Sequence, residues 1–178
     1  MNDGDLEMIA RELSDAYEGD KESRGDWSST YAEGLELLGM QYEDRTNPFP
    51  GASGVSHPLL AESVTQFQAQ SYKELFPAGG PVKTQIMGAI SPQVEQQSQR
   101  VKEFMNFQLT HVMEEYEPEL DQMLFHLPLS GSAFRKIYFD NTLGRPVSKF
   151  VSSEDLVVPY EATDLHTCSR ITHVVKMM

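Results

Sequence analysis

The densest group of carboxylates in the chain could perform acid–base chemistry or bind Mg²⁺. Its members are Glu114, Glu115, Glu117, Glu119 and Asp121. Pro118 lies in the middle of this run, and acids around a proline-broken helix more often form a solvated corner. A carboxylate–metal hydrolase that uses Glu114, Glu115 and Asp121 is therefore kept only as an alternative.

Serine and cysteine nucleophiles have no recognisable setting in this sequence. Residues 51–55 resemble the G-x-S-x-G elbow around Ser53, but the fifth position is Val55 and a Pro-rich loop precedes it instead of an apolar strand. Ser130 is interpreted as part of a helix terminator. Cys168 has no identifiable base beside it, which favours an inert structural thiol.

Metal and phosphate sites also lack their usual spacing. No HxxxH, HxH or ExxH pattern joins the five histidines, which are His57, His111, His126, His166 and His173. Gly79–Lys83 could be a phosphate nest with Lys83 as its cation, but a helix-to-strand turn explains the two glycines. Because no nucleotide-binding or metalloprotease motif occurs either, we expect no enzyme, no catalytic residue, no cofactor and no metal.

The net charge of the chain limits which classes of partner are expected. The 178 residues hold 14 Lys and Arg against 27 Asp and Glu, a net charge of −13. This disfavours a protein that grips DNA or RNA, or one that docks on anionic lipid. No apolar run approaches the ~20 residues that span a bilayer. A single cysteine permits no intramolecular disulfide, which fits a reducing compartment. Residues 1–50 alone carry −9, so residues 1–44 are predicted to be an acidic module.

Apolar periodicity predicts a helical first half. Two amphipathic helices are expected in the acidic module, joined at Gly19–Gly25. A rigid Pro-rich segment follows, in which Phe49 is expected to anchor into a neighbouring helix or subunit. Further helices are predicted from about Pro58 to Phe76 and from the N-cap Ser91 onward, the latter with a kink or boundary at Pro118.

The second half changes to a period of two. Val82–Ile86 is expected to be a short strand, and a hairpin is predicted from 133–139 and 147–151 around the turn 140–146. Strands are also expected at 156–158 and 171–177. The fold class is therefore α+β, with residues 45–178 as one α+β region. Because the alternation stops in mid-strand, we expect an N-terminal fragment of a longer protein.

Five blocks in this order resemble the N-terminal region of portal proteins of tailed phages, of the kind found in short-tailed phages. The similarity covers about residues 24–176, and the blocks are residues 45–72, 100–109, 127–140, 145–158 and 169–173. The resemblance implies most of the outer wing of a portal subunit, truncated before the stem, clip and crown. It implies no catalytic residue.

The resemblance also implies a function. Portal subunits assemble as a ring, usually a homododecamer, at the unique capsid vertex of the virion after synthesis in the host bacterial cytoplasm. The ring contacts the major capsid protein, docks terminase and tail or adaptor proteins, and is the conduit for double-stranded DNA in packaging and ejection. An acidic ring would pass DNA without tight binding, and no membrane is involved. The other alternative is a small acidic adaptor that binds a partner protein through its N-terminal helices.

Overall fold

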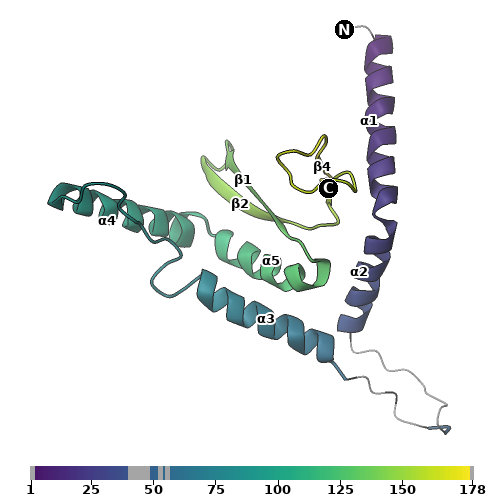
Figure 1. The fold of residues 1–178 in the computed structure, drawn as a ribbon, viewed down its shortest axis with the longest axis horizontal. Coiled ribbons are helices and arrows are strands. Elements are labelled where there is room, and N and C mark those ends of the chain that lie inside the picture. The colour runs from purple at the N-terminus through teal and green to yellow at the C-terminus, as the bar shows by residue number, and fades with distance from the viewer. Residues whose placement is uncertain (1–2, 40–48, 52–53, 55–56, 177–178) are drawn as a thin grey trace. The chain divides into compact units, whose positions relative to one another are not determined.

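The computed structural model describes residues 3–39, 49–51, 54 and 57–176, which form an α+β fold as expected (Figure 1). Its helical segments are α1 (Asp3–Ser23), α2 (Gly25–Leu38), α3 (Leu59–Leu75), α4 (Pro92–Phe107), the π-helix η1 (Gln108–Val112) and α5 (Tyr116–Ser130). Its strands are β1 (Phe134–Asp140), β2 (Arg145–Val151), β3 (Leu156–Val157) and β4 (Thr172–His173). Within the described ranges, no helix combines the length and the apolar character needed to cross a membrane.

The chain divides into two compact units. Unit 1 comprises Met1–Ala61 and Ser152–Met178, and unit 2 comprises Glu62–Val151. The expected module boundary at residues 44 and 45 lies outside the described residues.

In unit 1, α1 continues through Gly19 and ends at Ser23, so the prediction that the junction between the two helices begins at Gly19 is wrong. A helical glycine costs only about 1 kcal/mol relative to alanine, and polar contacts hold the turn that follows it. The buried Asp20 accepts two hydrogen bonds from Arg170, each 2.8 Å long. Arg24, the single residue between α1 and α2, donates to three carbonyl groups of residues 153–156. The two predicted amphipathic helices are confirmed, but only Arg24 separates them.

The second sheet of unit 1 is smaller than the sequence predicts. Strands β3 and β4 pair antiparallel over two residues each, with Leu156 opposite His173. The expected strand at 171–177 therefore shortens to Thr172–His173, because β3 offers only two residues to pair with and Pro159 follows soon after it. Val157 is buried, as is Tyr31 of α2, whose ring stacks on Trp27.

Unit 2 is built around α5 and the β1–β2 hairpin, which is confirmed in the predicted place. Gly131, in the left-handed region at φ 76°, ends α5. The buried apolar side chains of this unit come from α3, α5, β2 and the segment before α5, and they are Val64, Met113, Leu120, Leu124, Val147 and Val151.

The helical path before the hairpin differs from the prediction in one place. Helix α4, which has Ser91 as its N-cap, continues into the π-helix η1. The helical conformation is interrupted at Met113, not at Pro118. Pro118 instead lies in the first turn of α5, where a missing N–H removes no helical hydrogen bond. Pro128 is tolerated near the other end of α5.

The strand expected at Val82–Ile86 is absent. The side-chain amide of Asn106 on α4 forms hydrogen bonds with both backbone groups of Val82. Asn106 Oδ1 accepts from the Val82 N–H at 2.9 Å, and Asn106 Nδ2 donates to the Val82 carbonyl at 3.1 Å. Since this side chain satisfies both backbone groups of Val82, Val82 needs no partner strand, and residues 82–86 form no strand.

Candidate functional site

The acidic run around Pro118 is divided between two neighbours of α5. Glu115 and Glu119 bind the backbone of β2, whereas Glu117 and Asp121 bind side chains of α3. Glu114 is exposed. No group of three His, Cys, Asp or Glu side chains in the described part of the chain could hold a metal ion. Four carboxylates of this run, Glu115, Glu117, Glu119 and Asp121, therefore join α5 to α3 and to β2 within unit 2.

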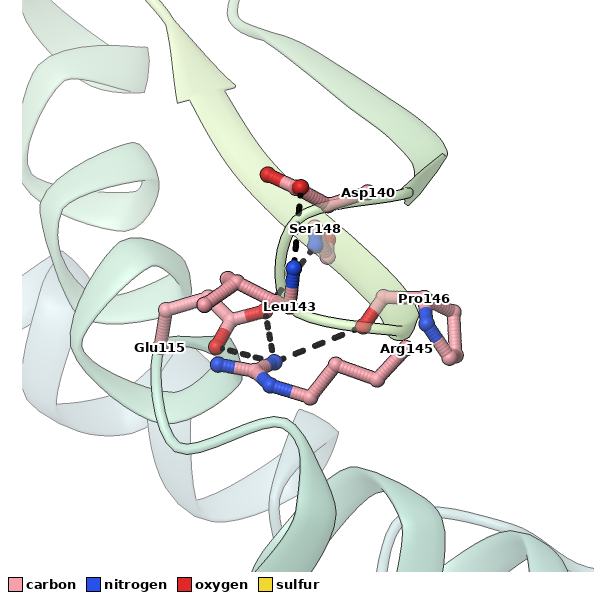
Figure 2. Close-up of polar contacts among 6 residues, drawn as sticks. All are labelled: Glu115, Asp140, Leu143, Arg145, Pro146 and Ser148. Atoms are coloured by element: carbon pink, nitrogen blue, oxygen red, sulfur yellow. Dashed lines mark hydrogen bonds and ion pairs between the residues drawn. The ribbon is translucent and has the colours of Figure 1, made fainter.

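Glu115 forms the most connected of these contacts. Arg145 Nη1 donates to both of its carboxylate oxygens, at 2.9 and 2.7 Å, and the Ser148 N–H donates to Oε1 at 3.3 Å (Figure 2). Partial burial raises the pKa of Glu115, but hydrogen bonds from its own N–H, Arg145 and Ser148 outweigh this effect and hold the pKa below its ordinary value.

Glu119 extends the same arrangement one helical turn further along α5. Its Oε2 accepts a hydrogen bond of 2.6 Å from the Phe150 N–H. Residues four apart on a helix rise about 6 Å, and residues two apart on a strand rise about 6.8 Å, so Glu115 and Glu119 match Ser148 and Phe150. Glu119 of α5 and Glu115, which directly precedes α5, thus cover the outer edge of β2.

The other two acids, Glu117 and Asp121, accept hydrogen bonds from side chains of α3. The Tyr72 hydroxyl donates to Glu117 at 2.5 Å, and this hydrogen bond raises the pKa of Tyr72 to about 12. Gln68 Nε2 donates to Asp121 Oδ1 at 2.7 Å. The acidic corner predicted from the sequence therefore links α5 to β2 through Glu115 and Glu119 and to α3 through Glu117 and Asp121.

The hairpin exposes apolar side chains on its other strand. Ile137 is 69% exposed, Phe139 61% and Leu143, in the turn, 57%. Among the described residues, β1 pairs with β2 and with no other strand. Within the turn, Asp140 Oδ1 accepts hydrogen bonds from the N–H groups of Leu143 (Figure 2) and Thr142, and these bonds lower the pKa of Asp140. An edge strand with exposed Ile and Phe is a surface suited to a protein partner.

The hairpin also gathers basic side chains that the sequence spreads out. Lys136 lies directly opposite Lys149 in the register, and both are exposed. Arg135 lies over the Tyr116 ring at 4.2 Å and donates to the Tyr116 carbonyl, and Arg145 binds Glu115. In sequence only Arg135 and Lys136 are adjacent, so the pairing of Lys136 with Lys149 needs the hairpin register to be visible.

The other predicted candidates form local structural hydrogen bonds or lie outside the described residues. Ser130 donates to the carbonyls of His126 and Ser132 at the end of α5, which confirms its interpretation as part of the terminator. Cys168 donates to the Arg170 carbonyl. Ser53 lies outside the described residues.

The histidines are dispersed. His111 stacks on Phe107 and contacts Thr110, and His126 stacks on Phe150. His57 is exposed, His166 follows the turn at Asp164, and His173 is half-buried in β4. At Gly79–Lys83 the Asn106 amide lies where a phosphate would bind, and a Cβ on Gly80, at φ 91°, would collide with it.

Two further apolar surfaces are exposed. Helix α4 contains no buried residue, although it carries an apolar row that includes Val101, Phe104 and Met105. Phe49 is 60% exposed, so the prediction that it anchors into a helix of this chain is wrong, while a contact with another subunit stays a prediction.

Comparison of the chain with protein-family models and with curated proteins found no match.

Proposed function

We propose that this chain is a structural subunit of a phage portal ring at the unique capsid vertex. The proposal is supported by the resemblance of the five sequence blocks and by the surface of unit 2. The ring would be the conduit for double-stranded DNA during packaging and ejection.

The observation that carries the proposal is the amount of apolar surface that unit 2 leaves uncovered. Helix α4 exposes Val101 and Phe104, and β1 exposes Ile137 and Phe139 on an edge without a second neighbour among the described residues. Exposed apolar patches of this kind mark protein–protein contacts. A subunit that is packed between copies of itself in a ring would cover them.

The remaining partners follow from the same proposal. Terminase, tail or adaptor proteins and the major capsid protein would contact the outside of the ring. DNA would pass through without tight binding, because the net charge of −13 opposes phosphate contacts.

Negative-stain electron microscopy of the protein made from its complete reading frame tests the proposal. Closed rings with a central channel wide enough for a DNA duplex are expected. Particles without rings, at concentrations where the protein is soluble and folded, would contradict it.

One observation favours the second candidate, an acidic adaptor. Helix α1 exposes Leu6, Ile9 and Leu13 on one face and is acidic elsewhere, as an adaptor helix would be. Recovery of one partner protein by α1 in a preparation that forms no rings would favour the adaptor. The hydrolase alternative gains no support, since Glu115 and Asp121 bind β2 and α3.

A further inference from the structure

Strand β1 has an outer edge that no second strand covers in the described part of the chain. On β2, the N–H groups of Ser148 and Phe150 point away from β1, where two carboxylates accept hydrogen bonds from them. Ser148 lies opposite Ile137 in the register, and Phe150 lies opposite Arg135. Residues directly opposite in an antiparallel pair turn their backbone groups either toward each other or both outward. The N–H and C=O groups of Arg135 and Ile137, and by alternation those of Phe139, therefore point outward along the free edge of β1.

The side chains near the hairpin turn are exposed as well. Ile137 is 69% exposed, Tyr138 36% and Phe139 61%, so both faces of the strand carry uncovered apolar surface. An edge strand with free backbone groups is a template for pairing with another strand, and natural edges prevent this with proline or with charge. The charged residues of β1 lie at positions 135, 136 and 140, so they leave the segment 137–139 apolar.

A second copy of β1 is the strand that matches this edge. The strand comprises seven residues, Phe134–Asp140, and Ile137 is the middle one. Two copies that pair antiparallel with Ile137 facing itself therefore overlap along their whole length. The outward groups of Ile137 then meet those of Ile137 in the second copy, and the groups of Arg135 meet those of Phe139. In this register every outward N–H and C=O group of one strand finds a partner on the other.

Charge favours this register over its neighbours. Arg135 faces Phe139 of the second copy, and Lys136 likewise faces Tyr138, so cations lie beside aromatic rings and no like charges are opposed. An axis one residue closer to the N-terminus would place Lys136 opposite Lys136, which is unfavourable. An axis one residue closer to the C-terminus would leave Arg135 beyond the end of the paired strand. The register centred on Ile137 is therefore the one that combines full overlap with compatible charges.

We propose that this chain forms a two-fold dimer in which β1 of one copy pairs antiparallel with β1 of the other, with Ile137 on the axis. The two hairpins then form one four-stranded sheet in the order β2–β1–β1–β2. Because the contact joins identical patches, it closes at two copies and differs from the head-to-tail contact between neighbours in a ring. The inference goes beyond the proposed ring function, since it describes the free chain, in which no ring neighbour covers this edge.

Charges placed on the two-fold axis test the pairing. Residue 137 faces itself in the dimer, so Ile137→Lys alone and Ile137→Glu alone each oppose like charges across the axis. An equimolar mixture of the two variants opposes unlike charges instead. Leu143→Lys and Leu143→Glu are matched controls, because Leu143 is 57% exposed in the hairpin turn, outside the paired strand. Sedimentation velocity of the 178-residue chain measures association, and circular dichroism checks the folding of each variant.

The parent and both Leu143 variants are expected to dimerise as concentration rises, more strongly at higher salt, because each copy carries a net charge of −13. Each Ile137 variant alone should raise the dimer dissociation constant about tenfold or more, and the equimolar mixture should restore the dimer. A parent that stays monomeric at its highest soluble concentration would overturn the contact. So would an Ile137 variant that associates like the controls, or a mixture that associates no better than its components.

Amide hydrogen exchange of the parent gives a second measure that needs no variant. In the dimer, the N–H groups of Arg135, Ile137 and Phe139 are hydrogen-bonded across the axis, whereas in the single chain they point outward from the sheet. Their exchange should therefore slow as the concentration rises. Exchange that is equally fast at every concentration would overturn the dimer. Rings of the complete protein are observed separately, so the dimer can fail while the ring proposal stands.

Discussion

Glu115 shows how one carboxylate joins the start of α5 to the hairpin. It binds the Arg145 guanidinium beside the hairpin turn and accepts a hydrogen bond from the Ser148 N–H (Figure 2). Its pKa is lowered, so its contribution to stability is complete above the unfolded-state value, near 4.5, and is lost as the pH falls through the folded-state value.

Glu115→Gln is expected to lower the free energy of unfolding at pH 7 by about 1–3 kcal/mol, because a charge-assisted hydrogen-bond pair is lost. The difference should shrink as the pH falls below 4.5, because the unfolded parent then takes up a proton that the folded parent binds less readily. Urea unfolding between pH 3 and 7 measures this. Glu114→Gln, an exposed neighbour, is the control and should change little. A Glu115→Gln deficit that is constant across this range would contradict the assigned pKa.

Ser148 supplies a second residue-scale prediction. Its side chain is 0% exposed and its hydroxyl has no hydrogen-bond partner, although its backbone N–H binds Glu115. A buried hydroxyl without a partner costs free energy, so Ser148→Ala should leave the melting temperature unchanged or raise it. Ser130→Ala, which removes a hydroxyl within hydrogen-bond distance of the His126 and Ser132 carbonyls, should instead cost about 1 kcal/mol. A clear loss of stability in Ser148→Ala would mean that its hydroxyl has a partner.

At the scale of elements, local periodicity predicted the helices and the hairpin, because the spacing of apolar residues is a property of each segment by itself. The prediction failed where hydrogen bonds from a side chain far away in the sequence determine the backbone conformation. Val82 is held by Asn106 instead of a strand, and the turn after Gly19 is held by Arg24 and Arg170. Such contacts span between 24 and 150 residues and leave no local pattern.

The candidate site was predictable only in part. The acidic run could be singled out from its density, but its role needed the position of β2 and α3 beside α5. Likewise, Ile137 and Phe139 read as ordinary alternation of a half-buried strand until the structure showed both to be exposed. The Lys136–Lys149 pair depends on the register, which turn length sets and composition does not.

Arg24 carries the element-scale prediction for unit 1. Its guanidinium donates to the carbonyls of Ser153, Glu154 and Leu156 at 2.6–3.0 Å and stacks on Trp27. Lysine has no planar fork, so Arg24→Lys should lose about 1–3 kcal/mol and speed amide exchange in α2 and in residues 153–157. Arg11→Lys on the exposed part of α1 is the control. Unchanged exchange in Arg24→Lys would show that these bonds do not hold unit 1 together.

The whole molecule combines a strongly acidic charge with uncovered apolar surface. The acidic charge suits a conduit that does not retain DNA. The exposed apolar surface suits a subunit whose apolar side chains are covered by neighbouring subunits. The hairpin, residues 134–151, is the exception to this acidic charge, with four basic residues against one acid.

Double-stranded DNA should therefore bind weakly. An apparent dissociation constant weaker than ~10⁻⁴ M near physiological salt is expected, no tighter than ordinary non-specific binding. Fluorescence anisotropy with a labelled duplex of about 30 base pairs measures it. Saturable micromolar binding that falls steeply with salt and disappears in Lys136→Glu with Lys149→Glu would make the hairpin a DNA contact instead.

The central claim is ring assembly, and mass photometry of the protein made from its complete reading frame tests it most directly. The account predicts one dominant species whose mass is a fixed multiple of the subunit mass, near twelve, and which persists on dilution. A folded protein that is found as a monomer throughout would contradict the portal-ring account.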